Sequence, residues 1–390
     1  MGRDIHRLAG DSLHIRTCRR SARSVLANAS LLAASLVVGL IVLEIVLGQT
    51  HYRDLTLPRS DYPPGYFVAD LELGADLGID RPPATFRMRG PSFEVFTDHW
   101  GCFDQGGPLD DGYVLAVGDS STWGYVRPGD RWTDQLETLS GERILNCGVS
   151  GTGPRYQRIK AQRTIARAGT APKVILVLYD TWNDFNDDAV FPGYGVVDGY
   201  RGHTLKALDL RTGVLTRHTP EEFLSRYRRF LARQESFDLA RFLTGHLTIA
   251  AMIDHVLSGQ PRRRAAPAEH PVLEQRYDFF LWNVDTARYP WVAEAFERHL
   301  DNLRALQEMA DEQGAVLVLI TDGIPQEGLH GRLRAFLGSE IPYHLDLAEP
   351  MALAAQGRRI RYHHDPHWNA LGNRLAAEII HRYLGETGLL

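Results

Sequence analysis

The sequence predicts a parallel α/β domain that follows a single membrane-spanning helix. Three observations lead to this prediction: short all-apolar runs alternate with helical patterns, polar residues follow those runs directly, and one long apolar segment lies near the N-terminus. With 390 residues, 44% hydrophobic and 23% charged, the composition excludes a disordered, collagen-like or coiled-coil chain. The net charge of −5 disfavours a nucleic-acid-binding protein.

The N-terminal residues indicate a membrane anchor. Residues 1–24 carry six arginines against two aspartates, and the apolar segment Leu26–Leu47 is long enough to cross a bilayer as a helix. A cleavable signal peptide has a shorter apolar core and a small-residue cleavage site, which Val46–Leu47–Gly48 does not provide. We therefore expect a basic cytoplasmic tail (1–24) and an uncleaved transmembrane anchor (25–48) in the inner membrane. Because basic flanks stay in the cytoplasm, the rest of the chain is expected in the periplasm or outside the cell.

Two further regions are expected beyond the anchor. Residues 49–110 are rich in proline, glycine and aspartate, which favours an extended linker and entry segment. The domain proper is expected over 111–388, with a mainly helical insert at about 189–289. Its strands are predicted at Tyr113–Val117, Arg143–Asn146, Lys173–Tyr179, Ala315–Thr321 and His344–Ala348. Strands that alternate with helices form a parallel sheet, and functional residues of such sheets gather at the carboxyl ends of the strands. We therefore expect a site at those ends.

Three strand ends carry residues suited to acyl chemistry. Ser120 follows the first strand in a glycine turn, where it is either an exposed nucleophile or a helix cap. After the second strand, Gly151 belongs to a glycine-rich loop that either points an amide into a pocket or is simply flexible; its spacing does not match a phosphate-binding or dinucleotide-binding loop. Asn183 follows the third strand and is either an oxyanion donor or part of an Asx turn.

A histidine-rich segment precedes the predicted last helix. His367 has Asp365 two residues before it, the combination that holds a general base in one tautomer. Metal binding is the alternative use of such a cluster, but the sequence has no second ligand cluster and no cysteine pair. We therefore expect neither a metal nor another cofactor.

These four blocks, in this order, resemble the SGNH hydrolase family, also called GDSL-type esterases. The resemblance covers about 113–188 and 290–385, and its blocks are Gly118–Ser120, Asn146–Gly151, Asn183–Asp184, and Asp365 with His367. It implies a three-layer flavodoxin-like fold, with Ser120 as nucleophile, His367 as general base and Asp365 as the residue that orients His367. It also implies an oxyanion hole made by the amides of Ser120 and Gly151 and the side chain of Asn183.

Two positions depart from the common family pattern. Many members carry Asp-x-x-His, whereas the spacing here is Asp365-Pro-His367; this shorter form resembles membrane-associated members, including the alginate O-acetyltransferase-like branch. His363 or His364 is the alternative partner. Ser121 stands where the family has leucine.

The resemblance and the anchor together predict a function. We expect a membrane-anchored serine esterase that removes O-acyl groups, above all O-acetyl, from a cell-envelope or secreted glycan. The alternatives are an O-acyltransferase that uses the same triad and takes its acyl group from a multi-pass membrane partner, a non-catalytic glycan-binding or assembly protein, and a lipase.

Five further residues have two interpretations each. Trp123, Trp182 and Trp368 lie next to the motif residues and would stack on a sugar ring, or pack in the core. Cys102 and Cys147 would share an oxidising compartment, where they form a disulfide or remain two separate core residues.

Overall fold

The computed structural model describes residues 5–56, 62–87, 92–109, 112–235, 239–258, 272–274, 281–363 and 365–390. The chain divides into two compact units. The smaller unit comprises Met1–Leu57 and Asp238–Gln260, and the larger unit comprises Pro58–Phe237 and Pro261–Leu390.

A five-stranded parallel sheet forms the centre of the larger unit. Its strands are β5 (Val114–Gly118), β6 (Ile144–Asn146), β7 (Val174–Tyr179), β13 (Val316–Thr321) and β14 (His344–Asp346). They lie in the order β14-β13-β7-β5-β6, and each neighbouring pair is parallel. All five predicted strands are confirmed, with ends that differ by at most two residues. Because β6 and β7 lie on opposite sides of β5, the strand order reverses between β5 and β7, the position where doubly wound sheets place ligands.

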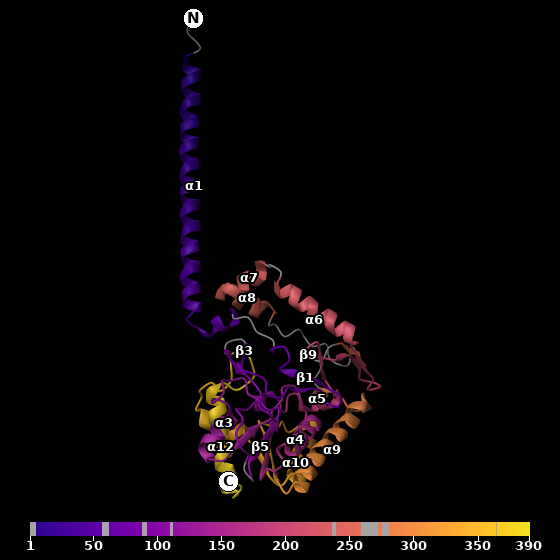
Figure 1. Cartoon of the computed structure of the whole chain (residues 1–390). Coiled ribbons are helices and arrows are strands. Elements are labelled where there is room, and N and C mark those ends of the chain that lie inside the picture. The colour runs from indigo at the N-terminus through magenta and orange to yellow at the C-terminus, as the bar shows by residue number, and fades with distance from the viewer. Residues whose placement is uncertain are drawn as a thin grey trace. The chain divides into compact units, whose positions relative to one another are not determined.

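Helices cover both faces of this sheet, as Figure 1 shows for α3 and α12 on one side of β5 and α4, α9 and α10 on the other. The helices of this layered core are α2 (Ser120–Trp123), α3 (Trp132–Ser140), α4 (Pro154–Ala168), α5 (Asp184–Ala189), α9 (Pro290–Glu312), α10 (Gly328–Glu340), α11 (Ala348–Ala355) and α12 (Ala370–Glu386). Successive strand residues face opposite layers: Leu115 and Val117 pack in the cluster with α4 and α9, whereas Val114 and Ala116 pack with α3 and α12. The predicted flavodoxin-like α/β class is therefore confirmed.

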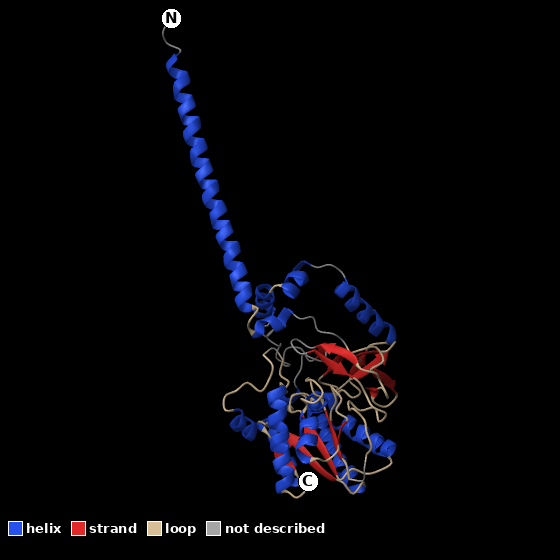
Figure 2. Ribbon diagram, turned by 60° about the vertical axis from the view of Figure 1, so that its left-hand side comes forward, coloured by secondary structure: helices blue, strands red, loops and turns tan. Residues whose placement is uncertain are grey.

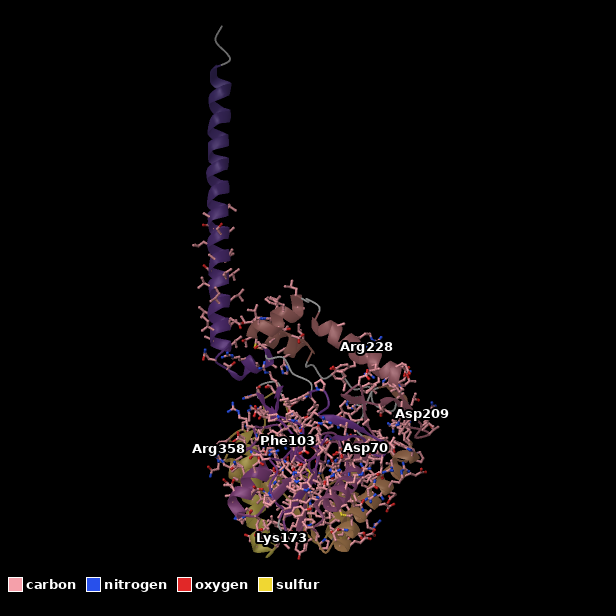
Figure 3. The ribbon with its side chains drawn as sticks, viewed as in Figure 1. Asp70, Phe103, Lys173, Asp209, Arg228 and Arg358 are labelled. Carbon is pink, nitrogen blue, oxygen red and sulfur yellow. A yellow bond between two sulfur atoms is a disulfide. The ribbon has the colours of Figure 1, made fainter. Side chains whose placement is uncertain are left out.

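The region expected to be a linker is in large part folded, and that expectation was wrong. It forms two antiparallel hairpins, β1 (Phe67–Asp70) with β2 (Gly74–Leu77) and β3 (Ala84–Arg87) with β4 (Ser92–Val95). The hairpins and the segment after them bury aromatic side chains, among them Phe67, Phe86 and Phe103, in a cluster with Trp123. Figure 3 places Phe103 within this unit. Four-residue strands are too short to show a period, so the surrounding prolines and glycines dominated the pattern.

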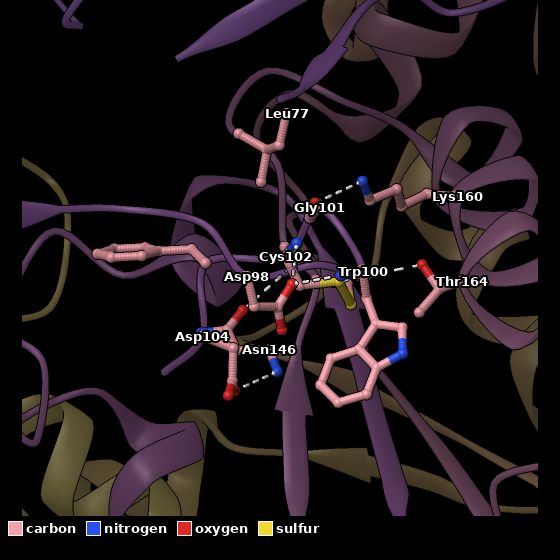
Figure 4. Close-up of a disulfide and its surroundings, with 12 residues drawn as sticks. Leu77, Asp98, Trp100, Gly101, Cys102, Asp104, Asn146, Lys160 and Thr164 are labelled. Atoms are coloured by element: carbon pink, nitrogen blue, oxygen red, sulfur yellow. Dashed lines mark hydrogen bonds between the residues drawn. A yellow bond between two sulfur atoms is a disulfide. The ribbon is translucent and has the colours of Figure 1, made fainter. Parts of the chain in front are cut away.

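A disulfide joins the folded entry region to the sheet. Cys102 is bonded to Cys147, which follows β6 directly (Figure 4). The chain around it is held by buried polar contacts: the Asp98 carboxylate accepts from the amides of Trp100 and Cys102, each at 2.9 Å, and Lys160 Nζ donates to the Gly101 carbonyl at 2.7 Å. Of the two interpretations of this cysteine pair, the structure has the disulfide.

The insert is a mixture of strands and helices, so the expectation of a mainly helical insert was wrong for its first part. Within the larger unit the insert holds β8 (Tyr194–Val197), β9 (Tyr200–His203), β10 (Leu205–Asp209), β11 (Leu215–Arg217), α6 (Pro220–Glu235), β12 (Val272–Glu274) and the 3-10 helix η3 (Leu281–Asn283). In Figure 2 the antiparallel strands form a second group, apart from the parallel sheet. The hairpin β8–β9 packs on β1.

The smaller unit contains the N-terminal helix and two helices from the insert. Its elements are α1 (Ile5–Leu47), the 3-10 helix η1 (His51–Thr56), α7 (Leu239–His246) and α8 (Thr248–Ser258). Ala27–Leu47 has a mean hydropathy of 2.6 and is long and apolar enough to span a membrane. Its side chains project on all sides of α1 (Figure 3). Such a helix is suited to a single-pass anchor.

Candidate active site

Ser120 lies where the chain turns sharply from the sheet into a helix. It is the first residue of α2, directly after β5 and Asp119. The turn needs Gly118, because a Cβ there would lie 2.2 Å from Thr122 Oγ1 and 2.8 Å from the Leu178 carbonyl oxygen. As the first residue of the helix, Ser120 has an amide with no intrahelical partner. The amide and the hydroxyl of Ser120 are thus presented together at the carboxyl end of β5.

His367 connects Ser120 to Asp365. His367 Nε2 lies 2.9 Å from Ser120 Oγ, and Nδ1 is hydrogen-bonded to Asp365 Oδ1. The same carboxylate oxygen accepts from the His367 amide at 3.1 Å. One ring nitrogen therefore faces a hydroxyl and the other a carboxylate, which is the arrangement of a general base beside a nucleophile. Of the two alternative partners, His363 is exposed, and His364 lies outside the described residues.

An aromatic residue that the sequence did not single out holds the His367 ring. The Tyr125 ring centroid lies 4.2 Å from that of His367. Tyr125 is fixed in turn, since its hydroxyl lies 3.0 Å from both Ser150 Oγ and Tyr62 Oη and its carbonyl accepts from Tyr362 Oη at 3.0 Å. The only sequence signal for Tyr125 is that it directly follows the glycine that ends α2.

The two outer donors expected in an oxyanion hole both contact Asp119. The Gly151 amide donates to Asp119 Oδ1, and Asn183 Nδ2 donates to Asp119 Oδ2. The Thr152 amide approaches Oδ1 at 3.3 Å, and Asn183 Nδ2 also contacts Asp187 Oδ2 at 3.0 Å. Asp119 is fully buried, so its charge needs these donors.

This network engages two of the three donors expected in the oxyanion hole. Gly151 and Asn183 do come together beside Ser120, from the ends of β6 and β7, but their N–H groups are already used. In this arrangement the Ser120 amide is the remaining donor of the expected three. Gly151 and Asn183 would donate to an oxyanion only after Asp119 releases them.

The three tryptophans lie in different environments. Trp123 is fully buried and donates its indole N–H to Tyr66 Oη at 3.0 Å, and Trp368 is 4% exposed within the α12 side of the core. Because Trp123 is fully buried, the prediction that it stacks on a sugar was wrong. Trp368 has almost no free ring surface for such a contact. Trp182 is 65% exposed at the carboxyl end of β7, next to Asn183.

A cavity of about 400 Å³ adjoins Trp182. It is lined by Thr181, Trp182, Trp282, Asn283, Asp322, Gly323, Pro325 and His330. The rings of Trp282 and His330 stack, with centroids 4.1 Å apart and planes 12° from parallel. The cavity thus combines flat aromatic surfaces with carboxylate and amide groups.

The carboxyl ends of the strands carry several acidic side chains. Burial, followed by the charge of Asp119, raises the pKa of Asp180 to about 6. Burial and the same neighbour raise the pKa of Asp184 well above its ordinary value. Burial also raises the pKa of Asp322, although Arg361 pairs with it and acts in the opposite direction. Within the described ranges, no group of three His, Cys, Asp or Glu side chains is placed to hold a metal ion.

The chain has structural but not sequence neighbours among known proteins. No family model matches the sequence, and no curated protein matches it. A psychrotrophic esterase from Pseudoalteromonas sp. is 8% identical, with 71% of this chain and 98% of that chain covered and a TM-score of 0.34. A catalytic mutant of an acetylxylan esterase from Geobacillus stearothermophilus is 11% identical, with 72% and 97% covered and a TM-score of 0.34. A member of the lipolytic G-D-S-L family from Veillonella parvula is 13% identical, with 70% and 96% covered and a TM-score of 0.32. TM-scores at this level are too low to indicate a function for this chain.

Proposed function

We propose that the protein is a membrane-anchored serine esterase that removes O-acyl groups from a glycan outside the cytoplasm. The observation that carries the proposal is the chain of contacts from Ser120 Oγ through His367 to Asp365, with 2.9 Å between Oγ and Nε2. These three groups can activate a hydroxyl for attack on an ester carbonyl.

The reaction proceeds through an acyl-enzyme. His367 Nε2 takes the proton of the Ser120 hydroxyl as Oγ bonds to the ester carbon, and Asp365 stabilises the resulting imidazolium. The Ser120 amide donates to the developing oxyanion. His367 then returns the proton to the leaving alkoxide as the ester C–O bond breaks. A water molecule, deprotonated by the same histidine, attacks the acyl group and frees Ser120.

The aromatic cavity supports a saccharide as the substrate. Trp182 presents an exposed ring one residue from Asn183, whose side chain reaches the carboxylate beside Ser120. Sugar rings pack their C–H faces on aromatic surfaces, and carboxylates and amides such as Asp322 and Asn283 accept and donate to sugar hydroxyls. We propose that an acylated sugar binds in this cavity with its ester directed toward Ser120.

The anchor and the disulfide support a location outside the cytoplasm. Six arginines precede the span of α1, and basic flanks remain on the cytoplasmic side. The larger unit would then lie on the opposite side, where disulfides such as Cys102–Cys147 form and persist.

The test uses the full chain in detergent and follows acetate release from 4-nitrophenyl acetate and from acetylated xylan. Ser120→Ala should lower kcat/KM by about 10³-fold or more, because it removes the nucleophile. Ser121→Ala is the matched control, since Ser121 lies in the same turn but is not the residue that contacts His367. Equal losses in both variants, or none in Ser120→Ala, would disprove the proposal.

The same experiment separates hydrolysis from acyl transfer. If wild-type protein accumulates a Ser120-linked acetyl group, detected by intact mass, but releases it only when a glycan is added, the enzyme is an O-acyltransferase. Release into water without an added acceptor identifies an esterase.

A further inference from the structure

Helices α7 and α8 carry an apolar surface that the candidate site does not use. In α8, Thr248–Leu257 is an apolar helix of ten residues. At 1.5 Å per residue it extends about 15 Å, roughly half the hydrocarbon thickness of a bilayer, so it cannot span one. An apolar helix of this length is either a core helix or a segment at a membrane interface.

The exposure of α8 excludes the core alternative. Ile253, Val256 and Leu257 are 49%, 58% and 73% exposed, and they follow the i, i+3, i+4 spacing of one helix face. The same spacing recurs on α7, where Leu239, Phe242 and Leu243 are exposed. We call these six residues the hairpin surface. Soluble proteins rarely leave apolar patches of this kind in water.

A carboxylate at the end of the membrane span holds α8 in place. Glu44 Oε1 accepts from the Thr248 amide at 2.6 Å and Oε2 accepts from the Ile249 amide at 3.0 Å. These are first-turn amides, which have no partner within the helix and favour a negative charge. Thr248 and Ala251 are buried, and α8 packs against α1 and η1.

The position of Glu44 determines how far along α1 the start of α8 lies. Glu44 is three residues before Leu47, the last residue of the apolar segment. The start of α8 is therefore at the level where α1 leaves the hydrocarbon. The charge of Glu44, which would be costly in the hydrocarbon, is satisfied by the amides of a second helix at that boundary.

We propose that α7 and α8 lie in the interfacial layer of the bilayer that α1 spans, with the hairpin surface inserted among lipid headgroups and upper acyl chains. Three observations indicate that lipid covers the hairpin surface. The surface is apolar, it belongs to the same compact unit as the span, and Glu44 joins the start of α8 to the end of the span. This inference does not depend on the proposed ester chemistry.

The test places a fluorescent reporter on the hairpin surface of the full chain. Phe242→Cys and Val256→Cys are made in a Cys18→Ser background, in which Cys102 and Cys147 are joined to each other. Leu353→Cys, on α11 of the larger unit and 71% exposed, is the control. Each variant is labelled with an NBD fluorophore and reconstituted into phosphatidylcholine–phosphatidylglycerol vesicles. Quenching by lipids with a doxyl group near the headgroup is compared with quenching by aqueous iodide.

The expected result is a blue-shifted emission and doxyl quenching at positions 242 and 256, and iodide quenching alone at position 353. Iodide quenching without doxyl quenching at all three positions would overturn the proposal. Protection from both quenchers at 242 and 256 would overturn it as well, because protein rather than lipid would then cover the surface. Only variants that keep the wild-type thermal unfolding profile are compared, so that misfolding does not decide the outcome.

Discussion

Among the described residues of the larger unit, two histidine–carboxylate pairs have the same pattern of hydrogen bonds. In the candidate site, His367 lies between Asp365 and the hydroxyl of Ser120. The second pair is formed by His299 on α9. Its Nδ1 lies 2.8 Å from Asp188 Oδ2, and its Nε2 lies 2.8 Å from Tyr179 Oη. Both are therefore hydroxyl–imidazole–carboxylate chains, and both hydroxyls lie at the carboxyl end of a strand, Ser120 after β5 and Tyr179 as the last residue of β7.

The two chains differ in access and in the nature of the hydroxyl. The side chains of His367 and Asp365 are 19% and 15% exposed, whereas those of His299 and Asp188 are 0% and 2% exposed. Tyr179 is fully buried, and burial together with the charges of Asp184 and Asp188 raises the pKa of its phenol well above the ordinary value. A substrate carbonyl cannot reach a hydroxyl enclosed in this way.

The buried pair has a structural role that can be read from its contacts. His299 lies on α9, Asp188 on α5 and Tyr179 at the end of β7, and Asp188 Oδ1 also accepts from the Arg155 amide at 3.0 Å near the start of α4. Four elements are thus joined by one polar network. The comparison teaches that the triad pattern of hydrogen bonds identifies a reactive site only when a ligand can reach the hydroxyl.

The largest effect in this comparison is expected for Asp365→Asn. The asparagine keeps the shape of the side chain but removes the charge that stabilises the imidazolium, so kcat should fall by about 10²- to 10⁴-fold. The matched control is Asp188→Asn, which makes the same change in the buried pair and should leave kcat of the folded protein within about threefold of wild type. Initial rates of acetate release by both variants provide the measurement. A similar loss of kcat in Asp188→Asn would contradict the distinction between the accessible pair and the buried pair.

The next effect is a loss of stability in His299→Leu. Leucine fills a similar volume, but it removes the buried partner of Tyr179 Oη and one of two groups bonded to Asp188 Oδ2, which keeps Asn302 Nδ2 at 3.1 Å. The unpaired phenol costs about 1–3 kcal/mol and the loss at the carboxylate about 1 kcal/mol, so we expect a total of about 2–4 kcal/mol. Thermal unfolding of the larger unit, followed by near-ultraviolet circular dichroism, checks this value. An unchanged unfolding temperature would show that the network adds nothing to the fold.

A third effect concerns pH and the acidic strand ends beside the reactive pair. The pKa of Asp180 is raised to about 6 from an ordinary value of 3.8. At a pH between these two pKa values, Asp180 is protonated in the folded chain but ionised in the unfolded chain. The contribution of Asp180 to the free energy of unfolding therefore falls as the pH rises from about 4 to 6, and it is constant above pH 6. The whole difference is at most about 3 kcal/mol.

Asp180→Asn should remove this dependence, because the amide does not titrate and its oxygen can still accept from the Trp182 amide, as Asp180 Oδ1 does at 2.8 Å. The unfolding temperature of the variant, relative to wild type, should therefore rise between pH 4 and pH 6.5. Parallel curves for the two proteins would show that Asp180 titrates at its ordinary pKa.

The sequence predicted the sheet, and it brought Ser120 and His367 together as candidates, because both follow local rules. Buried parallel strands are continuous apolar runs, and strand ends gather functional residues, so Ser120 and His367 could be related although they are 247 residues apart. The buried pair also had a signal that was not used. His299 occupies the apolar face of α9, between Phe296 and Leu303, where a histidine needs a buried partner.

Other features depend on contacts that no local pattern encodes. A mainly helical insert was predicted at about 189–289, but the break between α7 and α8 at Leu247 was not. The carboxylate that accepts from the start of α8 lies 204 residues away, in Glu44. Likewise, Asp119 occupies the N-cap position of α2, but its side chain makes no capping hydrogen bond and instead accepts from the donors expected for the oxyanion. Each of these contacts is fixed by tertiary packing.

The smallest expected effect gives the sharpest test, because it removes a single hydroxyl. Tyr179→Phe deletes the Oη that lies 2.8 Å from His299 Nε2, just as Ser120→Ala deletes the Oγ that lies 2.9 Å from His367 Nε2. We expect Tyr179→Phe to cost about 1 kcal/mol, the usual net value of one hydrogen bond, and to leave kcat unchanged. The unfolding temperature should fall by about 2 °C. Ser120→Ala should do the reverse, with activity lost and the unfolding temperature nearly retained. Ser120 is itself buried, at 9% exposure, but its hydroxyl is hydrogen-bonded to His367, whose side chain is 19% exposed and can bond to water instead. If both variants lost activity, or both lost only stability, the two histidine–carboxylate pairs would have the same role. Access of a ligand to the hydroxyl would then not distinguish a catalytic hydroxyl from a structural one.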